Sequence, residues 1–275
     1  MGRADGRRIK TLPPFTKIIP YIMVDRVDAT NYISIDFPYD KVNQYINQCK
    51  RKGNTEITMM ACILAAFIRT IAKYPETNRF VIAKKIYARK GIWVSFVTLK
   101  DNWSGKGEPE ETVVKLEFTG YETLTEVANA INNVVEKNRK HTSSNAMDKL
   151  VDKIFSIPIV PSAIVSFLKW LDRRGLLPLG ILKASPFHTS IFFSNMASIR
   201  SYPIYHHIYN FGSTSVFIAL GMDLSVRKKY MMNISTDERI CNGATFVHAM
   251  RYFMKCLLHP EYLEEAPVSV NEDIK

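Results

Sequence analysis

The chain has 275 residues, 47% of them hydrophobic and 23% charged, which is enough to bury the core of one large domain or two small ones. Lysine and arginine number 37 against 26 acidic residues, and the net charge of +11 favours an anionic partner: nucleic acid, a phosphate-bearing cofactor or an anionic membrane surface. The four cysteines lack zinc-type spacing and no apolar segment follows the charged N-terminus, which excludes a disulfide scaffold and a secretory signal and predicts a cytoplasmic protein with reduced thiols.

The first elements follow a basic lead-in of residues 1–15. Apolar runs predict strands at 18–24 and 31–37, the second with a clear period of two. An amphipathic helix is expected from Asp40, its N-cap, to Gly53. Residues 57–74 are apolar nearly all round, but interspersed Thr, Arg and Lys favour a buried central helix over a membrane span.

The middle and end of the chain alternate strands with helices. Strands are expected at 80–83, 85–87, 92–99, 113–118, 189–196, 215–221 and 230–235. Helices are expected from Thr123 or Thr125 to Arg139, and from Asn242 to just before Pro260. The acidic tail, residues 262–275, is expected to be poorly ordered beyond Pro267.

An apolar segment interrupted by prolines occupies residues 150–182. It predicts two short amphipathic helices joined at Arg174-Gly175, because Pro158, Pro161 and Pro178 rule out one continuous helix. Two interpretations stay open for it: a helical subdomain packed on the core or on another subunit, or a flap facing lipid or an apolar substrate. The second rests on the aromatic and basic edge that Trp170 and its neighbours would give within 155–180, which suits peripheral membrane contact.

The order of elements predicts an α/β fold, a two-layer sandwich with a helical insertion near 150–182. No internal repeat and no linker divides the sequence, so a single domain spanning residues 1–275 is expected.

A short charged cluster lies between the last strand and the last helix. Asp237-Glu238-Arg239-Ile240-Cys241-Asn242-Gly243 resembles the Asp-His-Arg-x-x-Asp-Gly signature of the acyltransferase components of 2-oxo acid dehydrogenase complexes, and the related His-x-x-x-Asp-Gly of chloramphenicol acetyltransferases. In that superfamily the histidine takes a proton from a thiol or hydroxyl, and the later aspartate holds the site together through an arginine. Here Glu238 stands at the histidine position and Asn242 at the aspartate position.

Further parts of the resemblance extend over roughly residues 8–260. Arg8-Ile9 is similar to the basic residues before the family's core, and Ser194-Asn195 is similar to its Ser-Asn, whose hydroxyl lies near the tetrahedral oxyanion. The resemblance implies a homotrimer or a multiple of trimers, coenzyme A as co-substrate and a small-molecule acyl acceptor, the two substrates entering a channel between subunits from opposite sides. Within this superfamily the chain resembles small stand-alone bacterial relatives of the dehydrogenase acyltransferases.

Glu238 has two competing interpretations. A carboxylate is a poor base towards a thiol unless burial raises its pKa, so Glu238 would act as a base only in a narrow apolar channel. Alternatively, since Asn242 is uncharged, Glu238 is a structural partner of Arg8 or Arg239. Ser194 is likewise either an oxyanion donor, supported by Asn195, or a capping residue.

Tyr205, His206 and His207 lie in the connection between these elements, where they are candidates for substrate binding or for a replacement base. Neighbouring residues of a strand point to opposite faces, so no metal site is predicted. Nucleic-acid binding is not predicted either, because the basic residues are scattered and no phosphate-binding loop is present. We therefore expect a coenzyme A-dependent acyltransferase-like protein with an altered site, or an inactive trimeric scaffold that binds an apolar ligand or a membrane.

Overall fold

The computed structural model describes residues 3–99, 111–140, 160–223 and 229–275. The first part of the apolar insertion, 150–159, lies outside these ranges, so the structure does not address the expectations about it.

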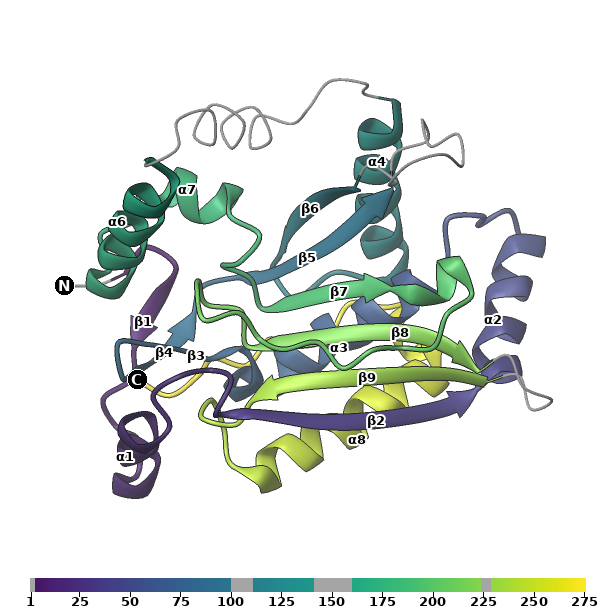
Figure 1. Cartoon of the computed structure of the whole chain (residues 1–275). Helices are drawn as coiled ribbons and strands as arrows, with labels where there is room; N and C mark the ends of the chain where they lie inside the picture. Colours follow the sequence, from purple (N-terminus) through teal and green to yellow (C-terminus); the bar gives the residue numbers. More distant parts are fainter. Residues whose placement is uncertain (1–2, 100–110, 141–159, 224–228) are drawn as a thin grey trace.

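Six strands form the main sheet, in the order β2-β9-β8-β7-β5-β6. Their bounds are β2 (Thr30–Pro38), β5 (Ile92–Leu99), β6 (Glu111–Phe118), β7 (Ile191–Asn195), β8 (Val216–Asp223) and β9 (Lys229–Asp237). β7 runs parallel to β5 and β8, and the other neighbours are antiparallel. Helices α3 (Met59–Lys73) and α8 (Gly243–Leu258) lie behind this sheet (Figure 1), which confirms the α/β two-layer sandwich.

The helix α3 (Met59–Lys73) is the centre of the hydrophobic core. Thr58 caps it by accepting a hydrogen bond from the Ala61 amide at 3.2 Å. Arg69, on the same helix, is buried because its guanidinium donates to two backbone carbonyls of the C-terminal segment. The prediction of a buried central helix is confirmed. Among the described residues, no helix combines the length and apolar character that crossing a membrane requires.

Three more helices pack around the sheet. They are α2 (Tyr39–Arg51), α4 (Leu124–Lys140) and α8 (Gly243–Leu258). α4 begins with a capping box, in which Thr123 and Glu126 each accept the other's backbone N–H. α2 starts one residue before Asp40, after Pro38, and no side chain caps it, so the expected Asp40 cap is wrong.

The face of the sheet opposite the helices carries the irregular segment 200–215. The Asn233 side chain donates to the Pro203 carbonyl at 3.1 Å, and the Met222 amide donates to the Ser201 carbonyl at 2.9 Å. A Cβ atom on Gly221 would lie 2.1 Å from the Pro203 nitrogen, so only glycine lets this segment approach β8 so closely.

A second sheet of three strands lies at one end of the main sheet, in the order β1-β4-β3. Its strands are β1 (Gly6–Arg8), β3 (Phe80–Ile82) and β4 (Lys85–Arg89). The turn between β3 and β4 has left-handed backbone at two residues other than glycine, Ala83 (φ 48°) and Lys84 (φ 61°). Such a conformation costs roughly 1–2 kcal/mol per residue, so the surrounding structure holds this turn in place.

The expected strand at 18–24 is wrong. These residues belong to the helix α1 (Pro14–Ile22) and to the chain after it. Pro14 occupies the first turn, where its missing N–H costs nothing, and Phe15, Ile18, Ile19 and Ile22 follow helical spacing. Nearly every residue from 18 to 24 is apolar, so the helical spacing could not be distinguished there from the pattern of a buried strand.

The described part of the insertion forms two helices, α6 (Val160–Arg174) and α7 (Leu179–Ala184), separated at Gly175 as expected. Asp172 of α6 is buried, because Arg3 donates to its carboxylate at 2.8 Å and the His188 ring lies 3.3 Å away. The ion pair with Arg3 and the contact with His188 therefore fix this end of α6 to the rest of the protein. Phe167 and Trp170, by contrast, are exposed and stacked on each other.

The C-terminal tail contradicts the expectation of disorder beyond Pro267. The Asn271 amide donates to the Ala72 carbonyl at 2.7 Å, and the Asp273 carboxylate binds the Arg79 guanidinium through both oxygens. Arg79 also donates to the carbonyl of Ile240 at 3.3 Å. The tail is thus tied, through one arginine, to the chain between β9 and α8.

Candidate functional site

The turn between β9 and α8 is built on a buried ion pair. Arg239 donates from Nε to Asp237 Oδ1 at 2.8 Å and from Nη2 to Oδ2 at 2.7 Å. Asp237 is fully buried and Arg239 nearly so. The two parallel hydrogen bonds of this bidentate pair fix the orientation of both side chains. The backbone on either side of Glu238 is therefore held firmly.

Neighbouring segments complete this arrangement. Arg239 Nη1 donates to the carbonyls of Met23 and Val24 at 2.8 and 3.0 Å, which ties the turn to the end of α1. The Glu238 amide donates to the Ala29 carbonyl at 2.9 Å. Arg26 lies 3.9 Å from the Asp237 carboxylate, so two guanidinium groups share one buried carboxylate.

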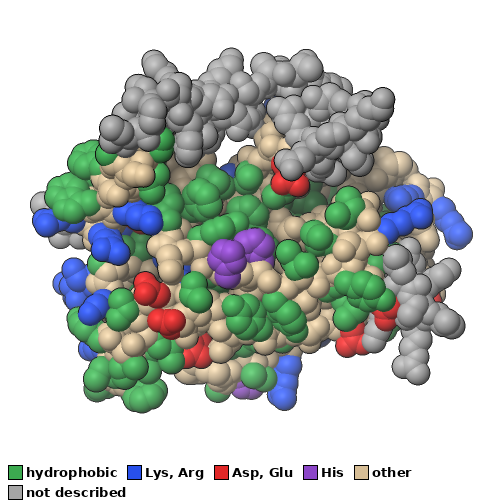
Figure 2. Space-filling model, viewed as in Figure 1, with side chains coloured by type: hydrophobic (Ala, Val, Ile, Leu, Met, Phe, Trp, Pro, Cys, Tyr) green, Lys and Arg blue, Asp and Glu red, His purple; other side chains and the backbone are tan. Residues whose placement is uncertain are grey.

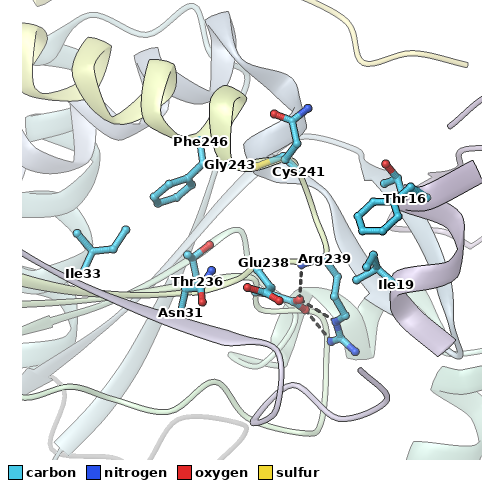
Figure 3. Close-up of a pocket in the computed structure, with 13 residues that line it drawn as sticks. Thr16, Ile19, Asn31, Ile33, Thr236, Glu238, Arg239, Cys241, Gly243 and Phe246 are labelled. Atoms are coloured by element: carbon cyan, nitrogen blue, oxygen red, sulfur yellow. Dashed lines mark hydrogen bonds and ion pairs between the residues drawn. The ribbon is translucent and has the colours of Figure 1, made fainter. Parts of the chain in front are cut away.

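The Glu238 side chain is half-buried and has no hydrogen bond or ion pair with any described residue. It lies in a cavity of about 330 Å³ between α1, the paired strands β2 and β9, and the start of α8 (Figure 3). The lining is mainly apolar, with Phe15, Ile19, Ile33 and Phe246, and Asn31 and Thr236 add polar groups. This cavity presents one free carboxylate in largely apolar surroundings.

Neither expected partner of Glu238 is in place within the described chain. Arg239 is paired with Asp237 instead, and Arg8 lies exposed on β1, where it pairs in register with Tyr87. The structural interpretation of Glu238 therefore has no support in this protomer.

Asn242 and Cys241 follow in the same turn. Asn242 caps α8, with its Oδ1 accepting the Thr245 amide at 2.8 Å. The Cys241 thiol lines the cavity, and burial raises its pKa to about 12, so it is a neutral thiol at pH 7 and a weak nucleophile.

Ser194 and Asn195 lie at the end of β7, as expected. Ser194 is half-buried, and no described residue forms a hydrogen bond with its hydroxyl. Asn195 caps the short 3-10 helix Met196–Ile199, accepting the Ser198 amide at 3.3 Å. Ser194 thus has a free hydroxyl, whereas the Asn195 side chain already has a local structural role.

Ser194 and Glu238 lie at opposite ends of the sheet within one chain. Ser194 is in register with Ala219 on β8, which is in register with Asn233 on β9, five residues before Glu238. At about 3.3 Å per residue, the two positions are about 16 Å apart along the strand direction. A site containing both side chains would need a second copy of the chain.

His206, His207 and Tyr205 lie on the sheet face opposite the helices, where Figure 2 shows histidine side chains among hydrophobic ones. The His206 ring stacks on Phe217 with a centroid distance of 3.9 Å, and its Nδ1 donates to the His207 carbonyl at 2.8 Å. Burial lowers the pKa of His206, so its neutral form leaves Nε2 as a free acceptor. Tyr205 contacts the edge of Tyr32.

His206 and Ser194 point to the same face of the sheet. Phe193 and Ile218 belong to the core on the helix side, and side chains alternate along a strand. Ser194 and Phe217 therefore point away from the helices, towards the segment that carries His206.

Sequence reasoning missed Asp237 and Arg26 as members of the site. An aspartate two residues before an arginine at a strand end is a local signal that could have indicated the first. Arg26 carries no such signal, because its partners come from distant segments: the carbonyls of Tyr209 and Val81, and Asp237.

No cluster of three or more histidine, cysteine, aspartate or glutamate side chains suited to a metal ion occurs in the described residues.

No protein-family model and no curated protein sequence matches the chain. Several solved structures match it. The cubic core of a pyruvate dehydrogenase multienzyme complex superposes with a TM-score of 0.58 at 11% identity, covering 93% of each chain. A chloramphenicol acetyltransferase gives a TM-score of 0.55 at 8% identity, covering 94% of this chain and 99% of the other. Dihydrolipoamide acetyltransferase from Azotobacter vinelandii gives 0.54 at 12% identity, covering 93% of each.

These likenesses show the fold: the chain has the architecture of chloramphenicol acetyltransferase and of dihydrolipoamide acyltransferase catalytic cores. At these identities they do not show a shared activity.

Proposed function

We propose that the protein is an acyltransferase that uses coenzyme A thioesters, with Glu238 as the base and Ser194 as the oxyanion donor. The observation that carries the proposal is the free carboxylate of Glu238. It lies in a cavity of about 330 Å³, on a turn that a buried ion pair fixes on both sides. Its position is therefore set, although none of the described residues forms a hydrogen bond or ion pair with its oxygen atoms.

The spacing of the site residues supports the same function. In the Azotobacter vinelandii enzyme, a serine, a histidine and an asparagine four residues after that histidine have been investigated for their roles in the catalytic mechanism. Glu238 and Asn242 are also four residues apart, and Ser194 precedes them at the end of β7. Asn242 therefore departs from the aspartate of the signature but has the spacing of the asparagine in the Azotobacter vinelandii enzyme, and it caps α8. Glu238 is then the larger chemical departure.

The proposed chemistry needs one proton transfer in each direction. The Glu238 carboxylate takes the proton of an acceptor hydroxyl or thiol, whose oxygen or sulfur attacks the thioester carbonyl carbon. Ser194 donates a hydrogen bond to the developing oxyanion. When the carbon–sulfur bond breaks, the leaving thiolate takes the proton back from Glu238.

The separation of Ser194 and Glu238 in one chain implies an oligomer, and we propose a trimer or a multiple of trimers. The pyruvate dehydrogenase neighbour is the cubic core of a multienzyme complex, which supports homo-oligomerisation in this fold. Light scattering coupled to size exclusion tests this part, because a strictly monomeric protein would separate the two catalytic groups.

The activity is tested with a panel of acyl-coenzyme A thioesters and hydroxyl and thiol acceptors, by following release of the free coenzyme A thiol. We expect Glu238→Gln to lower kcat by about 10²- to 10⁴-fold and Ser194→Ala by about 10²- to 10³-fold. Glu265→Gln and Ser166→Ala, at exposed positions away from the site, are the matched controls. Absence of turnover with every donor, or turnover that the two site variants leave intact, contradicts the proposal.

His206 is the second candidate for the base, because its free Nε2 lies on the same face as Ser194. The variant His206→Gln in the same assay decides between them. If His206→Gln loses kcat while Glu238→Gln remains active, His206 is the group that transfers the proton.

A non-catalytic role in membrane binding is favoured by one observation, the exposed aromatic pair Phe167 and Trp170 on α6, with Arg174 stacked on Trp170. Aromatic and basic side chains together suit a membrane interface. Flotation with anionic vesicles tests this role: Phe167→Ser with Trp170→Ser is expected to abolish flotation, and a wild-type protein that does not float contradicts it.

A further inference from the structure

A second cavity, of about 550 Å³, lies on the other side of Arg239 from the cavity of Glu238. Five segments surround it: the chain after α1, the β3–β4 turn, α6, the loop before β8 and the turn that carries Arg239. They bring together residues that are far apart in sequence, from Val24 to Arg239. Its volume is in the range of small-molecule sites.

Basic side chains dominate the lining of this cavity. Five cations face two carboxylates: Arg26, Lys84, Lys169, Arg173 and Arg239 against Asp25 and Asp172. Asp172 is already neutralised by Arg3, and Arg239 by Asp237, which leaves four cations facing Asp25. Unlike the Glu238 cavity, this one therefore has an excess of positive charge.

Three of these cations have no polar partner in the part of the chain that the structure describes. Lys84, Lys169 and Arg173 form no hydrogen bond or ion pair with any described residue, although Lys84 lies over the Tyr21 ring at 5.3 Å. Lys169 and Arg173 are four residues apart, on one side of α6. Lys84 reaches the cavity from the left-handed β3–β4 turn, a backbone conformation that only Gly adopts without cost.

Arg26 adds a buried charge. It is 6% exposed, two of its nitrogens donate to the carbonyls of Tyr209 and Val81, and its Nε lies 3.9 Å from the Asp237 carboxylate without a hydrogen bond. Burial lowers the pKa of Arg26 to about 10, so it is still charged at pH 7. An anion in the adjacent cavity would offset part of the cost of burying this charge.

We propose that this cavity binds a ligand carrying a phosphate or diphosphate group, held by Lys84, Lys169 and Arg173 with Arg26 behind them. The guanidinium and ammonium groups converge on the cavity from separate elements. Together they can bind the several oxygens of a phosphate, whereas a single carboxylate offers only two. The cavity is larger than a diphosphate, so it has room for the rest of a small molecule. This inference does not depend on the acyltransferase proposal.

Calorimetric titration of the full-length protein with sodium pyrophosphate at low ionic strength tests the site. We expect saturable binding that weakens as salt is added, since the attraction is between partly exposed charges. The combined variant Lys84→Gln, Lys169→Gln and Arg173→Gln is expected to raise Kd at least 10-fold.

The matched control removes the same number of charges from neighbouring positions outside the cavity: Lys85→Gln, Lys183→Gln and Arg174→Gln. It is expected to change Kd by no more than about twofold. Absence of pyrophosphate binding to the wild-type protein, or equal weakening in the two combined variants, overturns the proposal. Circular dichroism of both variants verifies that they are folded.

Competition with coenzyme A then identifies the source of the phosphate. Displacement of pyrophosphate by coenzyme A, lost in the cavity variant, assigns the site to the acyl donor, whereas binding without competition assigns it to a separate phosphate ligand. Either result supports an anion site here. Acyl transfer that fails while pyrophosphate binding persists contradicts only the proposed activity.

Discussion

The two ends of the six-stranded sheet hold their polar groups in different ways. Where β9 ends and β7 begins, Asp237 pairs with Arg239, and Asp172 with Arg3 beside His188, all of them buried. Where β7 ends, Ser194 has no partner among the described residues, and Asn195 only caps a short 3-10 helix. One end is therefore fixed by buried ion pairs, whereas the other has a free hydroxyl and a local helix cap, so the same kind of substitution should have very different effects at the two ends.

The largest effect is expected from breaking the ion pair beneath Glu238. Asp237→Ala leaves Arg239 buried without its carboxylate and should lower the free energy of unfolding by about 3–5 kcal/mol. Denaturant unfolding at fixed protein concentration measures it. Ser194→Ala, at the other end, should change stability by no more than about 0.5 kcal/mol. Equal losses in the two variants would contradict the comparison.

The next effect concerns the tail that supports the same end. Asp273→Asn removes the charge bound by Arg79 and should lower the free energy of unfolding by about 1–3 kcal/mol. Because Arg79 also donates to the Ile240 carbonyl, amide hydrogen exchange of residues 238–243 should become faster. Glu272→Gln, exposed in the same tail, is the control. Unchanged exchange in the turn would show that the tail does not support it.

A smaller effect is expected at the cap of α8. Asn242→Ala removes the acceptor of the Thr245 amide and should cost about 1 kcal/mol of unfolding free energy, measured by thermal or denaturant unfolding. Asn242→Asp, which keeps the acceptor, should retain most of the stability. If the aspartate variant is as unstable as the alanine variant, the cap is not what stabilises the turn.

The most gradual effect is pH dependence at His188, which precedes β7. Burial lowers the pKa of His188 below its ordinary value of about 6.5 despite the nearby carboxylates of Asp172 and Asp5. The unfolded chain then binds the proton more readily, so stability should decrease as pH falls through about 6.5. The variant His188→Gln should make the unfolding free energy depend less steeply on pH between 7 and 5.5. The variant His248→Gln, at an exposed position on α8, should leave this dependence unchanged. If His188→Gln leaves the pH dependence of the unfolding free energy unchanged, another titratable group is responsible for it.

Much of the local structure at the two ends of the sheet could be predicted from the sequence. Period-two patterning and capping residues located β2, α4 and α8, and the charged turn with Glu238 was correctly placed between a strand and a helix. Local signals of this kind depend on a few neighbouring residues, and those residues are present in the sequence.

The errors arose where the outcome depends on distant contacts. The run at 18–24 is continuous in its apolar character, and only its packing decides between helix and strand. The tail looked disordered because nothing local shows that Arg79 will meet Asp273. The partners of Arg239 include two carbonyls at 23 and 24, and such backbone acceptors leave no trace in residue type.

The route of the C-terminal tail also has a consequence for biosynthesis. Domains fold as units while the chain leaves the ribosome from its N-terminus. Arg79 emerges early, yet its carboxylate partner is residue 273, so the contact between Arg79 and the Ile240 carbonyl gains this charge partner only after residue 273 has been translated. A nascent protein stalled before that point could already form the pair between Asp237 and Arg239, but it would lack the support that the tail adds to the turn.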